Sequence, residues 1–482
     1  GEIHTPNLNW LARGGLRYTQ HYSTGRCWPS RAALTTGYYA QQVRRDALRD
    51  RGVGSRPPWA PLVSERLQEA DYRCYHHGKW HIDGAVLDNG FDHSYRLNDH
   101  DRFFAPQNHL LDGEPLPTPD PGSGFYVATA MADHAIHCLR QHYRQHRDQP
   151  FFSYLAFTSP HFPLHALQRD IDRYRNRYLM GWDQVRRDRW LRMSRMGLID
   201  AELSDREYDI IPGWNLPEEE LQERIGPGEA GRAVPWYTLS REQREFQATK
   251  MAIHAAMIDR MDQEIGRVLD QLRAMGELDN TLVMFASDNG ASAEQIIRGD
   301  EHDPDSVPGS GESYLCLGPG WSTAANAPLR LHKSWVHEGG IASPLIVHWP
   351  EGIGARNELR HGVGHFVDLP RTMCDVAEVE WTRDWDGATG PPTPGMSLAH
   401  TFERDRDVGH DTLWWHHDGH RALRMGKWKV VARAGQPWEL YDLEADRTET
   451  HNLAGAYPER TEELAARWER EADRYYEQAK PD

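Results

Sequence analysis

The chain has 482 residues, of which 39% are hydrophobic and 26% are charged, and its formal net charge at pH 7 is −17. This composition is typical of a globular protein with a large hydrophobic core. The negative charge argues against nucleic acid as a partner, because binding to phosphates needs a basic surface. No apolar run approaches the ~20 residues of a membrane-spanning helix, so no membrane partner is expected.

The first predicted element is a helix over residues 7–19, with Asn7 as its N-cap and leucines along one apolar face. A second, short helix is expected to begin at Cys27. The sequence of this segment is Cys27-Trp28-Pro29-Ser30-Arg31-Ala32-Ala33-Leu34-Thr35-Thr36-Gly37.

This second helix predicts an anion site. Pro29 suits the first helical turn, and Gly37 can end the helix. The free N–H groups and the positive end of the helix dipole would then face the Cys27 thiol. Arg31, one turn later, adds a cation whose guanidinium suits a tetrahedral oxyanion. We therefore predict that Cys27 is a nucleophile at the start of a helix.

Helices and strands alternate over the next 300 residues, which predicts an α/β fold. The expected helices span residues 60–70, 128–147 and 240–276, and the expected strands span residues 72–77, 150–157, 281–286 and 344–349. Residues 165–235 are charged and irregular, and we expect a surface insertion beside a cleft.

Polar residues follow several of these strands, where open α/β sheets bind their ligands. Lys79 and His81 follow the first strand two positions apart, so they share one face of an extended segment. His161 follows the second strand, and Asp288 and Asn289 follow the third. The oxygens of the last two residues suit Ca²⁺ or Mg²⁺ better than a soft metal.

The C-terminal part has a different pattern. Glycine and proline cluster over residues 386–394, which places a boundary between a large domain, residues 1–390, and a small one, residues 391–482. Alternating polar and apolar residues predict an antiparallel sheet followed by a closing helix. The strands are expected at residues 422–424, 428–431 and 438–441, and the helix at residues 458–476.

The five cysteines include no Cys-x-x-Cys pair, so no zinc or thioredoxin-like motif is predicted, and disulfide pairing stays open. Several further histidines also lack zinc-binding spacing. We assign them to the cleft lining or the surface: His76, His77, His165, His332, His337, His416 and His417.

Five short motifs resemble those of the sulfatase family, and they occur in that family's order. They are Cys27-Trp28-Pro29-Ser30-Arg31, Gly78-Lys79-Trp80-His81, Ser159-Pro160-His161-Phe162-Pro163, Ser287-Asp288-Asn289-Gly290, and Lys333 followed by Glu338-Gly339-Gly340. The resemblance extends to about residue 455. It implies an arylsulfatase-type enzyme with an alkaline phosphatase-like fold. The large mixed sheet would be flanked by helices, and a small antiparallel sheet with one helix would follow.

The same resemblance implies a modified nucleophile. In this family the equivalent of Cys27 is oxidised to formylglycine, so a formylglycine-generating enzyme is an expected partner. The hydrated aldehyde has two hydroxyls: one takes up sulfate from a small-molecule or carbohydrate sulfate ester, and the other allows its release. No oligomeric state is indicated, and the family resemblance favours a periplasmic or secreted location.

The other motif residues would assist this reaction. As in the family, the cations around the sulfate and the aldehyde hydrate would be Arg31, Lys79 and Lys333. His81 would accept the proton that allows the sulfated hydrate to collapse. His161, together with Lys333, would assist the leaving oxygen.

The family's metal site is only partly matched. The resemblance implies Ca²⁺, with Mg²⁺ as the alternative, bound by Asp288, Asn289 and the oxidised Cys27. In sulfatases two adjacent aspartates on a first strand complete the site, and no such strand precedes Cys27 here. We therefore expect an N-terminally truncated chain with weak Ca²⁺ binding and an unfilled position in its sheet.

Two alternatives remain. A phosphonate or phosphate monoester hydrolase can share the formylglycine motif. A non-catalytic relative could bind sulfated ligands without turnover.

Overall fold

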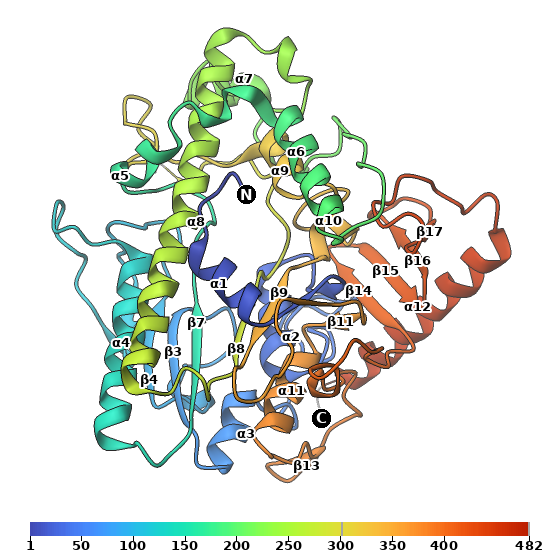
Figure 1. Ribbon diagram of the computed structural model, residues 1–482. Coiled ribbons are helices and arrows are strands. Elements are labelled where there is room, and N and C mark those ends of the chain that lie inside the picture. Colours follow the sequence, from blue (N-terminus) through green and yellow to red (C-terminus); the bar gives the residue numbers. More distant parts are fainter. Residues whose placement is uncertain (300–301, 481–482) are drawn as a thin grey trace.

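The computed structural model describes residues 1–299 and 302–480, and it confirms the predicted α/β class (Figure 1). Three main sheets are present. The first has the order β6 (Glu114–Pro115), β5 (His109–Leu111), β4 (His93–Leu97), β3 (Arg73–Lys79), β7 (Phe151–Ala156). The second has the order β10 (Glu358–Arg360), β1 (Leu16–Tyr18), β9 (Leu345–His348), β8 (Val283–Ala286). The third is antiparallel: β14 (Leu413–His417), β15 (His420–Met425), β16 (Trp428–Ala432), β17 (Glu439–Asp442).

Helices cover both faces of the first sheet. α4 (Val127–Gln145) packs on β3 and β7, and α8 (Arg241–Met275) lies along α4 (Figure 1). α3 (Val63–Glu69) packs on β3 and on α11 (Asp368–Val376). α1 (Pro6–Gly14) packs against both α8 and β9, so it links the first and second sheets.

The remaining elements are short or peripheral. They are α2 (Cys27–Thr36), α5 (Gln168–Ile171), α6 (Gly181–Arg195), α7 (Glu218–Arg224), α9 (Gly318–Ala325), α10 (Glu338–Ile341), β2 (His21–Tyr22) paired with β11 (Gly364–His365), and β12 (Asp384–Trp385) paired with β13 (Ala388–Thr389). None of the helices in the described ranges is both long enough and apolar enough to cross a membrane.

The long helix α8 follows its sequence signals closely. The Ser240 hydroxyl accepts a hydrogen bond from the backbone N–H of Gln243 at 3.1 Å, and the Gln243 side chain reaches back to the Ser240 N–H. Gly276 ends the helix in the left-handed conformation, with φ of 79°. The predicted span of residues 240–276 is therefore confirmed within one residue at each end.

The outer edges of β7 and β8 line one cavity of about 1690 Å³. Each strand is the last of its sheet and has a strand partner on one side only, β3 for β7 and β9 for β8. Apolar side chains such as Leu155 and Phe285 line the middle of the cavity. Cys27 and Asp288 lie among its polar lining residues, so the polar site and the two sheet edges share one space.

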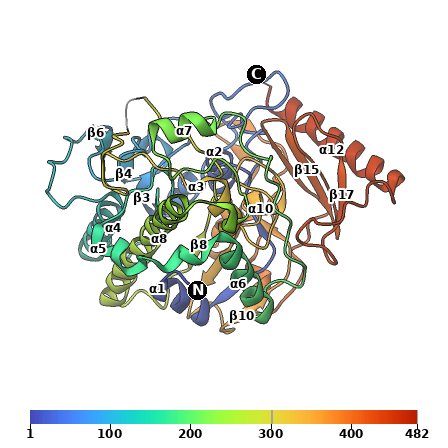
Figure 2. The same ribbon diagram turned by 90° about the horizontal axis from the view of Figure 1, so that it is seen from above.

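The third sheet is tied to the rest of the molecule by buried charges. α12 (Pro458–Gln478) covers one face of this sheet, packing on β15 and β16 (Figure 2). The ammonium of Lys429 on β16 lies 2.9 Å from Glu338 at the start of α10 and 2.8 Å from Glu449. All three side chains are fully buried, so removing one would leave a charge without its partner.

The predicted helix over residues 7–19 is wrong in its second half. α1 ends at Gly14, and Leu16–Tyr18 forms a strand of the second sheet. The backbone passes so close to β9 that a Cβ on Gly15 would lie 2.2 Å from the carbonyl oxygen of Val347. Asn7 is not the N-cap either, because it lies inside the helix and its side chain donates to Asp262 on α8.

The predicted irregular insertion is also more ordered than expected. Residues 165–235 include α6, and Trp182 of this helix is buried against Trp236 and Trp321, with ring centroids 4.8 and 5.7 Å away. Few apolar residues mark this helix, so its periodicity was weak in the sequence. The small C-terminal sheet also has a strand that we did not predict, β14.

One buried histidine makes stability depend on pH. Nδ1 of His417 on β14 lies 3.0 Å from Asp46, and Nε2 lies 3.2 Å from Asp418. Burial alone lowers the pKa of His417, but the hydrogen bonds and charges of these two aspartates raise it to about 9. Its contribution to stability is therefore fully present below the unfolded pKa of about 6.5 and is lost as pH rises through about 9.

We expect the midpoint of urea unfolding to be lower at about pH 10 than at about pH 6, and the difference to shrink in His417→Gln. His451→Gln is the control, because His451 is 70% exposed. An unchanged pH dependence in His417→Gln would contradict the assignment.

Candidate active site

Cys27 occupies the predicted position at the start of a helix. α2 begins at Cys27 and ends before Gly37, whose φ is 76° and whose N–H donates to the Ala33 carbonyl at 3.0 Å. The Cys27 side chain is 5% exposed and lines the large cavity. The N-terminal N–H groups of α2 therefore lie beside a nearly buried thiol, as an anion site requires.

Arg31 connects three segments of the site. Its Nε donates to the Asp288 carboxylate at 3.0 Å, and its Nη1 donates to the Lys79 backbone carbonyl at 2.9 Å. The Ser30 hydroxyl adds a bond to the Asp288 carbonyl. Burial alone would raise the pKa of Asp288, but Arg31 and Lys79 hold it below its usual value. Asp288 is therefore a carboxylate already paired with a guanidinium.

Lys79 is the last residue of β3, and the backbone requires a glycine at the position before it. Gly78 has φ of 116°, and a Cβ there would lie 2.5 Å from the Ala156 carbonyl oxygen. Lys79 is 2% exposed and forms no ion pair with a carboxylate in the described ranges. Burial lowers the pKa of its ammonium to about 8, and the charges of Arg31 and Lys333 also lower it. The site thus contains a buried cation that forms no salt bridge within the described residues, although the charge of Asp288 acts on it.

Lys333 lies between a histidine and a glutamate. Its Nζ is 3.3 Å from Nε2 of His161 and 3.1 Å from a carboxylate oxygen of Glu294. Burial and then the charge of Lys333 lower the pKa of His161 well below its usual range, so its imidazole is neutral. The backbone N–H of Lys333 donates to the carbonyl of Ala291, which fixes the loop next to Asp288.

Glu294 and Arg26 were missed from the sequence. Glu294 pairs with both Lys333 and Arg26, at 3.1 and 3.2 Å, and these two cations overcome the effect of burial and lower its pKa to about 2. A carboxylate could have been expected from the sequence, because a site with several buried cations needs carboxylates near them. Glu294 lies six residues after Asp288 on the same loop.

His81 lies beside the site and not in it. It lines a separate cavity of about 250 Å³ with Trp28 and Arg45. Its φ of 59° is a strained value for a residue other than glycine. Burial and then Lys79 lower its pKa, so it is electrostatically close to the site. The ring of His100, also missed, contacts both His81 and His161, with centroids 5.4 and 5.6 Å apart.

The structure therefore brings most predicted site residues to one cavity. Those that line it are Cys27, Arg31, Lys79, His161, Asp288, Asn289 and Lys333. The histidines that we assigned to the surface or cleft are mostly in the core: His76, His77, His165, His332, His337 and His417 are at most 3% exposed. The spacing of these histidines in the sequence does not distinguish residues buried in a strand from residues that line a cleft.

The described residues do not by themselves form a complete calcium site. Oδ1 of Asn289 is buried without a hydrogen-bond partner, which suits a ligand oxygen. Asp288 is the second oxygen donor, but Arg31 already occupies one of its oxygens. Ca²⁺ takes six to eight oxygens, and Mg²⁺ takes six in an octahedron. Two donors beside several cations are too few for either ion.

Comparison with known proteins gives the family. The sulfatase family model matches residues 1–379, and the model described as "N-sulphoglucosamine sulphohydrolase, C-terminal" matches residues 330–476. An uncharacterised sulfatase of Schizosaccharomyces pombe is 31% identical over 522 residues, covering 97% of this chain and 89% of the relative. The arylsulfatase of Klebsiella aerogenes is 29% identical, covering 83% of this chain and 87% of its own length.

Solved structures agree on the fold. A structure described as a complex with its substrate D-glucosamine-2-N,6-O-disulfate has a TM-score of 0.66 at 19% identity, covering 100% of this chain and 94% of the other. The phosphonate monoester hydrolase of Silicibacter pomeroyi has a TM-score of 0.59 at 19% identity, covering 98% and 91%. The chain is therefore a member of the sulfatase family with the alkaline phosphatase-like fold.

Proposed function

We propose that this protein hydrolyses sulfate monoesters of carbohydrates or phenols, with oxidised Cys27 as the nucleophile. The observation that carries the proposal is the buried ammonium of Lys79, which has no salt bridge within the described residues and acts electrostatically on Cys27, the first residue of α2. A buried charge without a partner is costly, so the site favours an anion at this position. The relatives named above are sulfatases, which agrees with sulfate as that anion.

The cations have distinct tasks in this proposal. Lys79 and the N-terminal N–H groups of α2 bind sulfate oxygens, while Arg31 is oriented by Asp288 and holds the loop around Cys27. Such preorganised charges stabilise the negative charge that spreads over the oxygens during transfer. Because Lys79 is already dehydrated, little solvent has to be rearranged when the substrate enters.

In the proposed reaction the bond between the ester sulfur and the leaving oxygen breaks, and a bond between that sulfur and the nucleophile forms. The hydrated aldehyde of a formylglycine at position 27 supplies one hydroxyl for attack and a second for release of sulfate. Lys333 and His161, 3.3 Å apart, supply the proton to the leaving oxygen. His81 lines the neighbouring cavity, and in this proposal it is the base that accepts the proton of the second hydroxyl.

A second candidate function is hydrolysis of phosphonate or phosphate monoesters. The fold is shared with a phosphonate monoester hydrolase, and the cations of the site fit either tetrahedral group. Comparing an aryl sulfate with an aryl phosphate, with and without Ca²⁺, separates the two. Faster turnover of the sulfate supports our proposal, and faster turnover of the phosphate supports the alternative. Binding of sulfated ligands without turnover of either ester would indicate a non-catalytic relative.

Cys27→Ala removes the nucleophile. We expect turnover of an aryl sulfate to fall by at least about 10³-fold in protein produced together with a formylglycine-generating enzyme. The unmodified Cys27 peptide should be absent from the mass spectrum of the parent protein. Cys316→Ala, another buried cysteine, is the control and should keep full activity. Normal turnover in Cys27→Ala would exclude the mechanism.

Lys333→Ala removes one preorganised charge. We expect kcat/KM for the aryl sulfate to fall on the order of 10²–10³-fold. Lys427→Ala is the matched control, because this lysine also pairs with a carboxylate but its side chain is 42% exposed. Equal activity of the two variants would show that Lys333 does not act in catalysis.

Calcium binding is expected to be weak. The two oxygen donors, Asp288 and Asn289, provide one carboxylate among several cations. Calorimetric titration of residues 1–482 with Ca²⁺ should therefore show no site with a Kd of about 10⁻⁵ M or tighter. A tight site that disappears in Asp288→Asn would show that further ligands complete it.

A further inference from the structure

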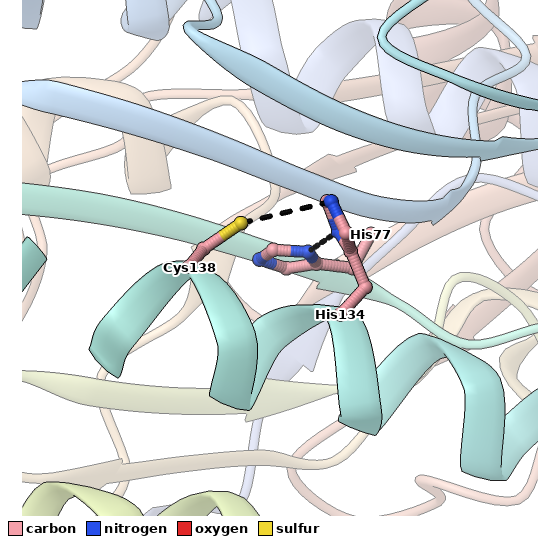
Figure 3. Close-up of side chains that lie close together, drawn as sticks. All are labelled: His77, His134 and Cys138. Atoms are coloured by element: carbon pink, nitrogen blue, oxygen red, sulfur yellow. Dashed lines mark hydrogen bonds between the residues drawn. The ribbon is translucent and has the colours of Figure 1, made fainter. Parts of the chain in front are cut away.

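A second cluster of metal-ligand side chains lies away from the catalytic cavity. His77 projects from β3, and His134 and Cys138 project from adjacent turns of α4, so that the three side chains point toward one another (Figure 3). Positions four apart on a helix share one face. None of the three lines the catalytic cavity. In the part of the chain that the structure describes, this is the single group of three or more such side chains arranged to hold a metal.

The distances fit a small metal ion. One ligand atom from each residue can be chosen so that all three lie within 4.8 Å of one another. In the metal-free protein His134 contacts both neighbours through different nitrogens: its Nδ1 is 2.7 Å from Nδ1 of His77, and its Nε2 is 3.6 Å from Sγ of Cys138. The ligand atoms of a tetrahedral zinc site lie roughly 3.3–3.8 Å apart, given metal–ligand bonds of about 2.0–2.3 Å. One ion binds a single nitrogen of His134, so the side chains have to rotate and one of the two hydrogen bonds of His134 has to break when the ion enters.

The outer nitrogen of His77 is already oriented as in a metal site. Nε2 of His77 lies 3.1 Å from the hydroxyl of Ser153 on β7. When Nε2 carries the proton and donates to this hydroxyl, the lone pair of Nδ1 points toward His134 and Cys138. Metal-binding histidines almost always have their second nitrogen held by such a partner.

The protonation states also suit metal binding. Burial lowers the pKa of His77 well below its usual range and that of His134 to about 4, so both rings are neutral. Burial raises the pKa of the Cys138 thiol to about 12, so the sulfur is protonated in the metal-free protein. Asp112 acts electrostatically on both His134 and Cys138, so a negative charge is close to the cluster.

We propose that His77, His134 and Cys138 bind one Zn²⁺ ion between β3 and α4. Imidazole and thiolate ligands together select zinc over the hard cations Ca²⁺ and Mg²⁺. On binding, the Cys138 S–H bond breaks, the sulfur donates its electron pair to the metal, and the proton is released to solvent. No electron is transferred. His77 and Cys138 are buried, and His134 is the partly exposed member of the cluster.

The site would join the first sheet to the helix that covers it. β3 carries Lys79 at its end, two residues after His77. A bound ion would therefore stabilise the strand from which a catalytic-site lysine projects, without touching the substrate. Zinc at this position is structural, and its effect is expected on unfolding before it is expected on turnover.

The test is titration of chelator-treated full-length protein with Zn²⁺, and separately with Co²⁺, which gives a thiolate-to-metal charge-transfer band when cysteine is a ligand. We expect one equivalent of Zn²⁺ to bind and to raise the thermal unfolding temperature. Cys138→Ala should abolish the Co²⁺ band, and His134→Gln should weaken Zn²⁺ binding at least about 100-fold. Ser153→Ala should weaken it by about 10–100-fold, because it removes the group that orients His77.

His137→Gln is the matched control, because His137 is an exposed histidine on the same helix and should leave binding unchanged. His134 is only half-buried, so its variant keeps the proposal testable if Cys138→Ala fails to fold. Absence of binding at micromolar Zn²⁺ would overturn the proposal. So would a Co²⁺ band that survives in Cys138→Ala and disappears in Cys27→Ala, since the ion would then lie in the catalytic cavity.

Discussion

The ion pair between Arg31 and Asp288 is the interaction on which the site depends. It joins the first turns of α2 to the loop after β8 at 3.0 Å, with the Arg31 side chain 7% exposed and that of Asp288 27% exposed. Burying a guanidinium is favourable only when its charge and its N–H groups are satisfied, and the Lys79 carbonyl supplies a further acceptor. Through these bonds one side chain fixes three segments that are distant in sequence. Lys79 has no such salt bridge within the described residues, so its charge adds to the positive potential of the cavity.

Close backbone contacts hold the rest of the site to this ion pair. The loop after Asp288 and the short helix α10 approach so closely that a Cβ on Gly290 would lie 1.8 Å from the Gly339 carbonyl oxygen. The Gly290 N–H donates to the Gly340 carbonyl at 2.9 Å. Glu338, next to these glycines, is paired with Lys429 of the third sheet. The small C-terminal sheet thus stabilises the loop that carries Lys333.

The sequence predicted what depends on local chemistry. Capping residues predicted α8 to within a residue, and the motif around Cys27 predicted α2 and the residues that meet beside it. The sequence did not predict the features that depend on contacts between segments distant in the chain. Nothing local in the 7–19 segment shows that Leu16–Tyr18 pairs with β9, and nothing local places Glu294 beside Lys333. His77 was assigned to the cleft or surface, since its neighbours His134 and Cys138 come from a helix more than fifty residues later.

Because Cys27 is buried in the folded chain, an enzyme that modifies it would need access to the thiol before folding is complete. Its side chain is 5% exposed, and the loops of Asp288 and Lys333 that enclose it belong to the second half of the chain. Ribosomes add about 5–20 residues per second, so roughly 10–50 s separate synthesis of the cysteine from synthesis of Asp288. Throughout that interval the thiol cannot be enclosed by its final neighbours. An enzyme that oxidises Cys27 would therefore have to act before these loops fold, because the folded chain encloses the thiol.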